Sequence, residues 1–331
     1  MSSNKVQSKI MKKLLAYIDK TAPKKHLTLL KEFACRFYGT ISQEDLEERD
    51  LLDLYGAMYS LWEFVNAHPV NDNSVRVYNP LHEKHSWQST HTIIEVIHND
   101  MPFLVDTISM EINREDMLAH LIVHTGCIYF ERNDNGSVLN ILNEKEAKEK
   151  NIVPQAVIYL EVDRQIDPKI LRKLQKNIAK VLSDVVLAVS DWRPMRRKVE
   201  EAINSLDSVK SLMCPEETQE AISFLQWALD NHFTFLGCRD YSLVGTKDKQ
   251  ALEPLLGTSL GVLKEKTDGN FSKSLAALPP RVRAMMLSDQ VLIIAKTNTI
   301  SSVHRRVYTD YIGVKCFDEK RKVVGVKLFI G

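Results

Sequence analysis

The feature that most constrains the fold is residues 90–192, where the hydrophobic period alternates between that of a strand and that of a helix. In order, the segments are HTIIEVIH, MPFLVDTISMEINRED, LAHLIVHTGCIYFER, QAVIYLEVDRQI, DPKILRKLQKNIAKVLSDV and VVLAVSDW. The first, third, fourth and sixth are short or β-branched and predict strands, whereas the second and fifth carry apolar stripes at helical spacing. This β-α-β-β-α-β order is that of a ferredoxin-like sandwich, so we expect an α+β fold.

Local signals support this order. The NDNG sequence after the second strand is a turn signal, and Asp167 and Pro168 stand at the cap and first positions of the second helix. Residues 141–153, ILNEKEAKEKNIV, interrupt the middle hairpin with charged residues. We expect a solvated excursion there.

The flanking sequence suggests three further regions. Residues 1–86 predict a helical lead-in, in which TISQEDLEERD supplies cap-type residues, before the domain at 87–192. Residues 193–215 predict a helical connector with a solvated charged face, and residues 216–331 a second α+β unit with a hairpin at FDEKRK. The sequence stops after the apolar strand VVGVKLFI, an edge that would favour aggregation. We therefore expect this sequence to be a piece of a longer protein. On this interpretation the second unit is either complete or cut short at residue 331.

Composition limits the function classes. The 331 residues are 44% hydrophobic, and 44 basic against 43 acidic side chains leave a net charge of +1. This balance disfavours nucleic acid or an anionic membrane surface as a partner. No apolar run approaches the roughly 20 residues that span a bilayer, and the N-terminus lacks a secretory pattern. Five widely spaced cysteines predict reduced thiols, so we expect a cytoplasmic protein.

Motifs for catalysis and cofactors are missing from the sequence. It contains no GxG and no GxxxxGK[ST], and we expect no catalytic residues and no nucleotide cofactor in this segment. A weak pattern for a metal site consists of His120 and His124, with His98 or His91 as a third ligand. The commoner outcome is that such histidines are partly exposed residues of a strand. We expect no metal. Cys127 and Cys238 are expected as small core residues.

The strongest candidate site is the joint HNDMPFLVDTIS between the first strand and the first helix. Amides at a helix start lack intrahelical acceptors, so this joint can hold a ligand carboxylate, while Asn99 or Asp100 can meet an ammonium group. The alternative is a plain helix cap by Asn99 or Asp100, with Pro102 in the first turn. From the residues alone, capping is the commoner outcome.

A second polar cluster lies in SSVHRRVYTDY, at His304, Arg305 and Arg306. Strand alternation would place His304 and Arg306 on one face and Arg305 on the other. The cluster either binds an anion or joins domains by salt bridges, and the second outcome is the more common. A self-contained enzyme built from Asp100, His98 and this cluster is a further alternative, which turnover by the isolated chain would reveal.

Three ordered stretches together resemble one family: NDMPFLVDTISMEINR, EAISFLQWALDNHFTFLGCRDYSL and SSVHRRVYTDYIGVKCFDEKRKVVGVKLFIG. They are similar to the N-terminal part of the large bacterial NAD-specific glutamate dehydrogenases, over roughly residues 20–331. The resemblance implies ACT-like modules with the strand and helix order described above. It also implies a catalytic domain downstream in the same chain, which deaminates L-glutamate to 2-oxoglutarate with NAD.

The resemblance further implies an amino-acid effector at the first strand-to-helix joint, commonly across a contact between two modules in a homo-oligomer. On this sequence the joint is Asn99, Asp100, Met101, Pro102, Phe103 and Leu104. Many amino-acid-binding modules carry glycine just before the helix, whereas here bulky residues fill the turn. The alternative is therefore an ACT-like assembly module without a ligand.

Overall fold

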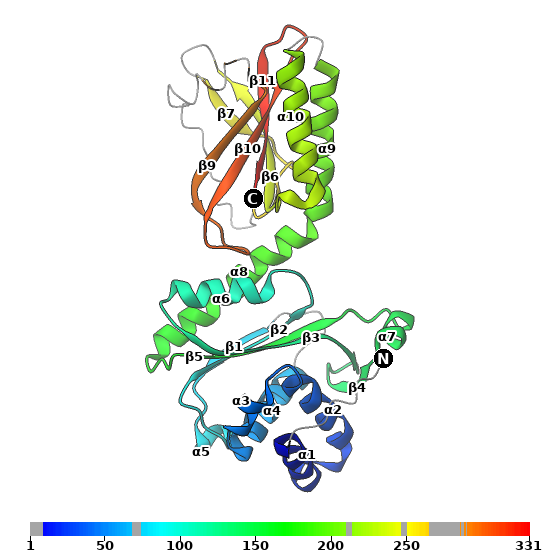
Figure 1. Cartoon of the computed structure of the whole chain (residues 1–331), viewed down its shortest axis with the longest axis vertical. Helices are drawn as coiled ribbons and strands as arrows, with labels where there is room; N and C mark the ends of the chain where they lie inside the picture. The colour runs from blue at the N-terminus through cyan, green and yellow to red at the C-terminus, as the bar shows by residue number, and fades with distance from the viewer. Residues whose placement is uncertain are drawn as a thin grey trace. The chain divides into compact units, whose positions relative to one another are not determined.

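The computed structural model describes residues 9–67, 74–209, 214–245, 250–264, 285, 288 and 290–331. It divides into two compact units, Met1–Lys180 and Val181–Gly331 (Figure 1). Each unit combines an antiparallel sheet with helices, which confirms the α+β class. These are called the first and the second unit below.

The first unit begins with helices, as expected for the lead-in. They are α1 (Lys9–Thr21), a 3-10 turn (Lys24–His26), α2 (Leu27–Tyr38), α3 (Gln43–Glu47) and α4 (Leu51–Asn66). Two of them are capped by side chains: Ser42 accepts from the amide of Asp45 at 3.1 Å, and Asp50 accepts from that of Leu52 at 2.7 Å. These caps explain why one helix starts within TISQEDLEERD and another starts directly after it.

The five-stranded sheet of the first unit has the order β1-β2-β5-β3-β4. Its elements are β1 (Ser74–Tyr78), α5 (His82–His85), β2 (Thr92–Asn99), α6 (Leu104–Arg114), β3 (Ala119–Arg132), β4 (Val138–Leu142), α7 (Glu144–Glu149), β5 (Gln155–Val162) and α8 (Pro168–Ser190). The β2-α6-β3-β5-α8 order confirms the first five elements of the predicted sandwich. All strand pairs in this sheet are antiparallel.

The prediction of a strand at residues 185–192 is wrong. Helix α8 continues to Ser190, and α9 (Trp192–Val209) follows it. The place beside β2 that this strand would have filled is taken by β1, which precedes β2 in the chain and pairs with it from Ser74 to Tyr78. The lead-in expected to be helical up to residue 86 therefore also supplies a strand. The sandwich is completed from its N-terminal side.

The excursion expected at 141–153 is only partly solvated. Ile141 and Leu142 are buried in β4, and the helix that follows buries Ala147 completely. Asn143 and Glu146 form a capping box at the start of α7, which explains a helix in this highly charged stretch.

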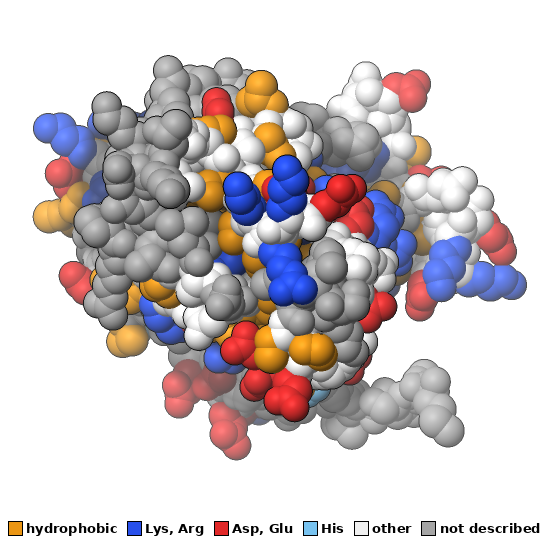
Figure 2. Space-filling model, turned by 90° about the horizontal axis from the view of Figure 1, so that it is seen from above, with side chains coloured by type: hydrophobic (Ala, Val, Ile, Leu, Met, Phe, Trp, Pro, Cys, Tyr) orange, Lys and Arg blue, Asp and Glu red, His pale blue; other side chains and the backbone are white. Residues whose placement is uncertain are grey.

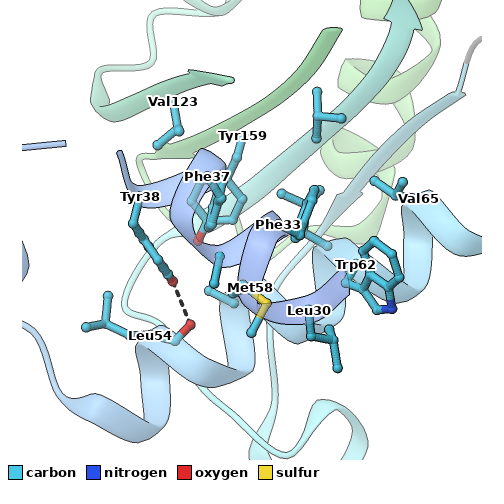
Figure 3. Close-up of a cluster of buried hydrophobic side chains, with 14 of the residues drawn as sticks. Leu30, Phe33, Phe37, Tyr38, Leu54, Met58, Trp62, Val65, Val123 and Tyr159 are labelled. Atoms are coloured by element: carbon cyan, nitrogen blue, oxygen red, sulfur yellow. Dashed lines mark hydrogen bonds between the residues drawn. The ribbon is translucent and has the colours of Figure 1, made fainter. Parts of the chain in front are cut away.

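Helices α2 and α4 cover one face of the sheet (Figure 3). Tyr38 donates its hydroxyl hydrogen to the Leu54 carbonyl at 2.6 Å, so its buried polar atom has a partner. The lead-in thus forms part of the main core of the first unit. The central side chains are Leu30, Phe33, Phe37, Met58, Trp62, Val65, Val123 and Tyr159.

The opposite face is covered by α6 and the first part of α8 (Figure 1). Every residue of β2 except Asn99 is buried, as expected for a strand enclosed on both faces. On α6, the residues Leu104, Ile108 and Ile112 are buried at four-residue spacing. This packing fixes the joint between β2 and α6.

The second unit has a sheet of order β7-β6-β11-β10-β9, and β8 pairs with β6. Its strands are β6 (Gly237–Val244), β7 (Ala251–Pro254), β8 (Leu260–Gly261), β9 (Leu292–Ile300), β10 (Tyr308–Phe317) and β11 (Val323–Ile330), preceded by α9, α10 (Pro215–Trp227) and a π-helical turn (Ala228–His232). The hairpin expected at FDEKRK is confirmed, and Asp318 donates its amide to the Lys322 carbonyl at 2.9 Å across it.

Helix α9 has the helical form and the exposed charged residues expected over 193–215, but it is part of the core of the second unit and not only a connector. Met195, Val199, Ala202 and Leu206 are buried, and they share a core with α10 and the sheet of the second unit. Its charged residues occupy the remaining face, as in an ordinary amphipathic helix. On the face of the molecule seen in Figure 2, positive and negative side chains are interspersed with hydrophobic ones, in line with the balanced composition.

Candidate functional site

The joint between β2 and α6 is a turn in which Phe103 adopts a left-handed backbone conformation, with φ of 73°. Helix α6 begins only at Leu104, and Phe103, its cap residue, makes no side-chain cap bond. The capping interpretation of Asn99 and Asp100 is therefore wrong, and Pro102 lies before the helix. A bulky residue in the left-handed region costs on the order of 1–3 kcal/mol, so the surrounding packing must hold the turn in this form.

Asp100 forms hydrogen bonds to residues that are distant in the sequence. Its amide donates to the Pro154 carbonyl at 2.9 Å, and its Oδ2 accepts from the Cys127 thiol at 2.8 Å. His124 Nε2 lies 3.9 Å from the other carboxylate oxygen. Asp100 therefore joins the turn to β3.

A β-bulge in β3 brings Cys127 to this position. The register against β5 shifts between His124 and Cys127, and Gly126 has a φ of 70°. The hydroxyl of Thr125 lies 3.1 Å from the Val157 carbonyl and accepts from the Val157 amide at 3.3 Å, which replaces ladder bonds lost in the bulge. Bulges redirect side chains in this way next to functional sites.

His98 is a buried polar residue of the joint, with 1% of its surface exposed. Its Nδ1 lies 2.8 Å from the Asn99 carbonyl, and its buried Nε2 has no hydrogen-bond partner among the described residues. Burial lowers the pKa of His98, against the opposing effect of the Asn99 carbonyl. With Nδ1 donating, Nε2 is an unused acceptor. Ala156 pairs with both His98 and Cys127, on either side of it in the sheet.

Cys127 is exposed, so the prediction that it is a core residue is wrong, whereas Cys238 is 1% exposed and confirms that prediction. The hydrogen bond to Asp100 raises the pKa of the Cys127 thiol, with smaller contributions from burial and the carboxylate charge. A nucleophilic cysteine needs a lowered pKa. The environment therefore favours a neutral thiol that donates a hydrogen bond.

The two strand histidines do not form one site. His120 Nε2 lies 2.8 Å from Asp163 Oδ1, whereas His124 faces Asp100. Within the part of the chain that the structure describes, no group of three or more His, Cys, Asp or Glu residues could hold a metal ion.

The cluster at His304, Arg305 and Arg306 lies in the second unit, in the loop between β9 and β10. The expected strand alternation is wrong, because these residues are in a loop where His304 has a φ of 68°. Arg305 and Arg306 are exposed, and neither forms an ion pair with a described residue. The loop is anchored by Ser302, which donates to Asp184 at 2.8 Å.

Sequence reasoning placed six residues at one strand-to-helix joint. In the structure Asn99 ends β2, Leu104 begins α6, and the residues between them form the turn; the six are Asn99, Asp100, Met101, Pro102, Phe103 and Leu104. Sequence reasoning missed Cys127 and His124 as neighbours of Asp100. The available signal was Thr125–Gly126, a glycine inside a strand-like run, which is typical of a bulge.

Comparisons with known proteins identify the family. Residues 33–178 match the family model described as "Glutamate dehydrogenase, ACT1 domain". The NAD-specific glutamate dehydrogenase of Halomonas elongata is 33% identical over 323 residues, 97% of this chain and 20% of that protein. The enzyme of the same name from Pseudomonas aeruginosa is 36% identical over 299 residues, 90% of this chain and 18% of that protein.

The matched range includes the second half of α2 together with α3, α4 and β1, and it ends within α8 before the wrongly predicted strand. The chain spans about a fifth of the length of these relatives. No helix among the described residues is long and apolar enough to cross a membrane. The chain thus belongs, through its ACT1 domain, to the family of NAD-specific glutamate dehydrogenases, and the resemblance drawn from the sequence is confirmed.

Proposed function

We propose that this chain is a regulatory and assembly segment of a cytoplasmic, homo-oligomeric enzyme that oxidatively deaminates L-glutamate to 2-oxoglutarate with NAD. The observation that carries the proposal is its similarity to NAD-specific glutamate dehydrogenases over 97% and 90% of its own length. The sequence has no glycine fingerprint for a dinucleotide, so NAD is held by a downstream catalytic domain. The isolated chain is then expected to show no glutamate- and NAD-dependent turnover.

An amino-acid effector would bind at the joint between β2 and α6. Asp100 offers a carboxylate to an ammonium group, and the unused Nε2 acceptor of His98 is a second polar contact. The start of α6 favours the ligand carboxylate electrostatically. Asn99, Met101, Pro102, Phe103 and Leu104 would shape the pocket around these contacts.

The experiment is a thermal-shift and calorimetric screen of the chain with the twenty amino acids and 2-oxoglutarate. A saturable response to one ligand, lost in Asp100→Ala and kept in Asp134→Ala, supports an effector at the joint. Asp134 is a suitable control because it is an exposed carboxylate in the NDNG turn.

The second candidate is an assembly module without a ligand, and the bulk of Pro102, Phe103 and Leu104 in the turn favours it. Silence across the ligand panel, together with a stable oligomer in light scattering, would select this candidate. A monomer that binds none of the ligands would contradict both.

A further inference from the structure

Strand β9 is an open edge of the sheet in the second unit (Figure 1). Among the described strands it pairs only with β10, and it is nine residues long. The strand at the opposite edge, β7, has four residues and ends in Pro254, and a short strand with a proline is a usual protection against further pairing. Residues 292–296 of β9, LIIAK, contain no proline and pair with β10 in an unbroken register. This part of the edge can therefore accept another strand.

The pairing with β10 shows which backbone groups of β9 face the open edge. The amide of Lys315 in β10 donates to the Val291 carbonyl at 3.0 Å. Backbone groups alternate in direction along an antiparallel strand, and the register continues unchanged from this pair. The amides and carbonyls of Leu292, Ile294 and Lys296 therefore point away from β10, where a further strand would meet them.

A groove of about 260 Å³ lies beside this edge, between β9 and α10. Apolar side chains line it, among them Phe224, Leu292 and Ile294, and Ile294 is 56% exposed. Glu217 and Glu220 of α10 line the same groove. Both are exposed, and their carboxylates form neither an ion pair nor a hydrogen bond with another described residue. The groove therefore suits an apolar side chain that arrives together with a positive charge.

Strand β9 itself carries both features on the face that the groove occupies. Because side chains alternate along a strand, Lys296 lies on the same face as Leu292 and Ile294. The side chain of Lys296 is 63% exposed, and its Nζ lies 2.7 Å from Asp310 Oδ1 at the surface. A second copy of β9 would thus bring an isoleucine and a lysine to the groove of the first.

We propose that two copies of this chain pair through β9 in a symmetric dimer, with Ile294 of one protomer opposite Ile294 of its partner. This antiparallel register uses all of residues 292–296 and forms about six backbone hydrogen bonds from groups that point away from β10. It sets Lys296 opposite Leu292 of the other protomer, which shares a groove with two glutamates. A register centred on Lys296 would instead set two lysines opposite each other, which is destabilising.

The inference rests on the assembly part of the proposed function, for which it supplies an interface. It does not involve the joint between β2 and α6, which lies in the first unit, whereas β9 lies in the second. An effector at the joint is therefore neither required nor excluded by the pairing of β9.

The test is analytical ultracentrifugation of the 331-residue chain over a range of concentrations. The variant Ile294→Lys places two lysines opposite each other in the dimer and should weaken self-association at least about tenfold. The matched control is Ile166→Lys, because Ile166 is an isoleucine of the first unit that is 86% exposed. This control should leave self-association unchanged.

An exchange of charges tests the register. Lys296→Glu should weaken self-association, because a glutamate then approaches Glu217 and Glu220 of the other protomer. The double variant Glu217→Lys/Glu220→Lys should weaken it as well, since it approaches Lys296. The triple variant that combines these changes restores opposite charges and should recover most of the affinity, which a general loss of stability would not do.

The outcomes separate this inference from the proposed function. Self-association that is unchanged in Ile294→Lys overturns the β9 interface and leaves assembly through another surface intact. A chain that is monomeric at every concentration overturns both the interface and the assembly role. Equal weakening by Ile166→Lys also overturns the interface, because it would show a general effect of added charge. A triple variant that recovers no affinity overturns the register proposed for Lys296.

Discussion

The clearest physical prediction concerns Glu95, a carboxylate in the middle of the apolar strand β2. It is fully buried and pairs directly across from Arg76 of β1, which donates to it at 2.6 Å, while Tyr78 donates at 3.0 Å. Burial raises the pKa of Glu95 from 4.5 to about 7, although Arg76 and Tyr78 oppose the shift. The folded chain therefore binds the proton more tightly than the unfolded chain does between these two pH values. The stability from this group is fully present below pH 4.5 and is lost as the pH rises towards 7.

The magnitude follows from the shift. A displacement of about 2.5 pKa units corresponds to about 3 kcal/mol of unfolding free energy, of which about 2.5 kcal/mol falls between pH 5 and pH 8. Glu95→Gln removes this titration while keeping the shape of the side chain. The unfolding free energy of Glu95→Gln minus that of the unchanged chain should therefore rise by about 2.5 kcal/mol from pH 5 to pH 8.

Urea unfolding measures this difference. When hydrogen exchange of a peptide from β2 is the readout, the measurement reports on the first unit alone. The control Glu149→Gln, on the exposed side of α7, should show no such pH dependence. A difference that stays flat between pH 5 and pH 8, or falls, would refute the reasoning. It would mean that Arg76 keeps Glu95 ionised in the folded chain at pH 5.

Three further changes test the packing and the ion pairs. Gly56→Ala should destabilise the first unit by about 2 kcal/mol in thermal unfolding, although alanine favours helices, because its Cβ would lie 2.2 Å from Trp87 Cβ. Arg49→Met should cost about 2 kcal/mol, because Glu161 with 4% exposure loses its cation, and Arg49→Met/Glu161→Met should recover most of this in urea unfolding. Asp191→Ala should cost about 1–2 kcal/mol in the second unit, because Asp191 Oδ2 accepts from the Gly261 amide at 2.9 Å and alanine leaves that buried amide without this acceptor. An unchanged unfolding midpoint in any one of these variants would contradict the stabilising role given to its contact.

The elements that sequence reasoning found are those with a long, regular period. The failure at 185–192 has a definite physical cause. Val185 and Ala188 continue the buried helical spacing of Ile178 and Leu182, and no glycine or proline interrupts residues 169–190. The β-branched valines suggested a strand, but burial along an existing helix outweighs that weak intrinsic preference. The five-residue β1 was missed for the converse reason, since its sequence SVRVY is too short for a reliable period.

The position of the candidate site in the chain could be predicted from the sequence. The contacts within the site could not, because they depend on the register of the sheet. Asp100 and Cys127 are 27 positions apart, and they meet only because a bulge at Thr125–Gly126 shifts β3 against β5. A one-residue change of register would turn Cys127 to the other face, which no local pattern in the sequence reveals. The signal that the sequence did carry was the presence of Glu95 and Glu161 inside otherwise apolar strands. Since a buried carboxylate requires a partner, each of these residues indicated a polar network contributed by the preceding helices or β1. Both networks exist, Glu95 with Arg76 and Glu161 with Arg49.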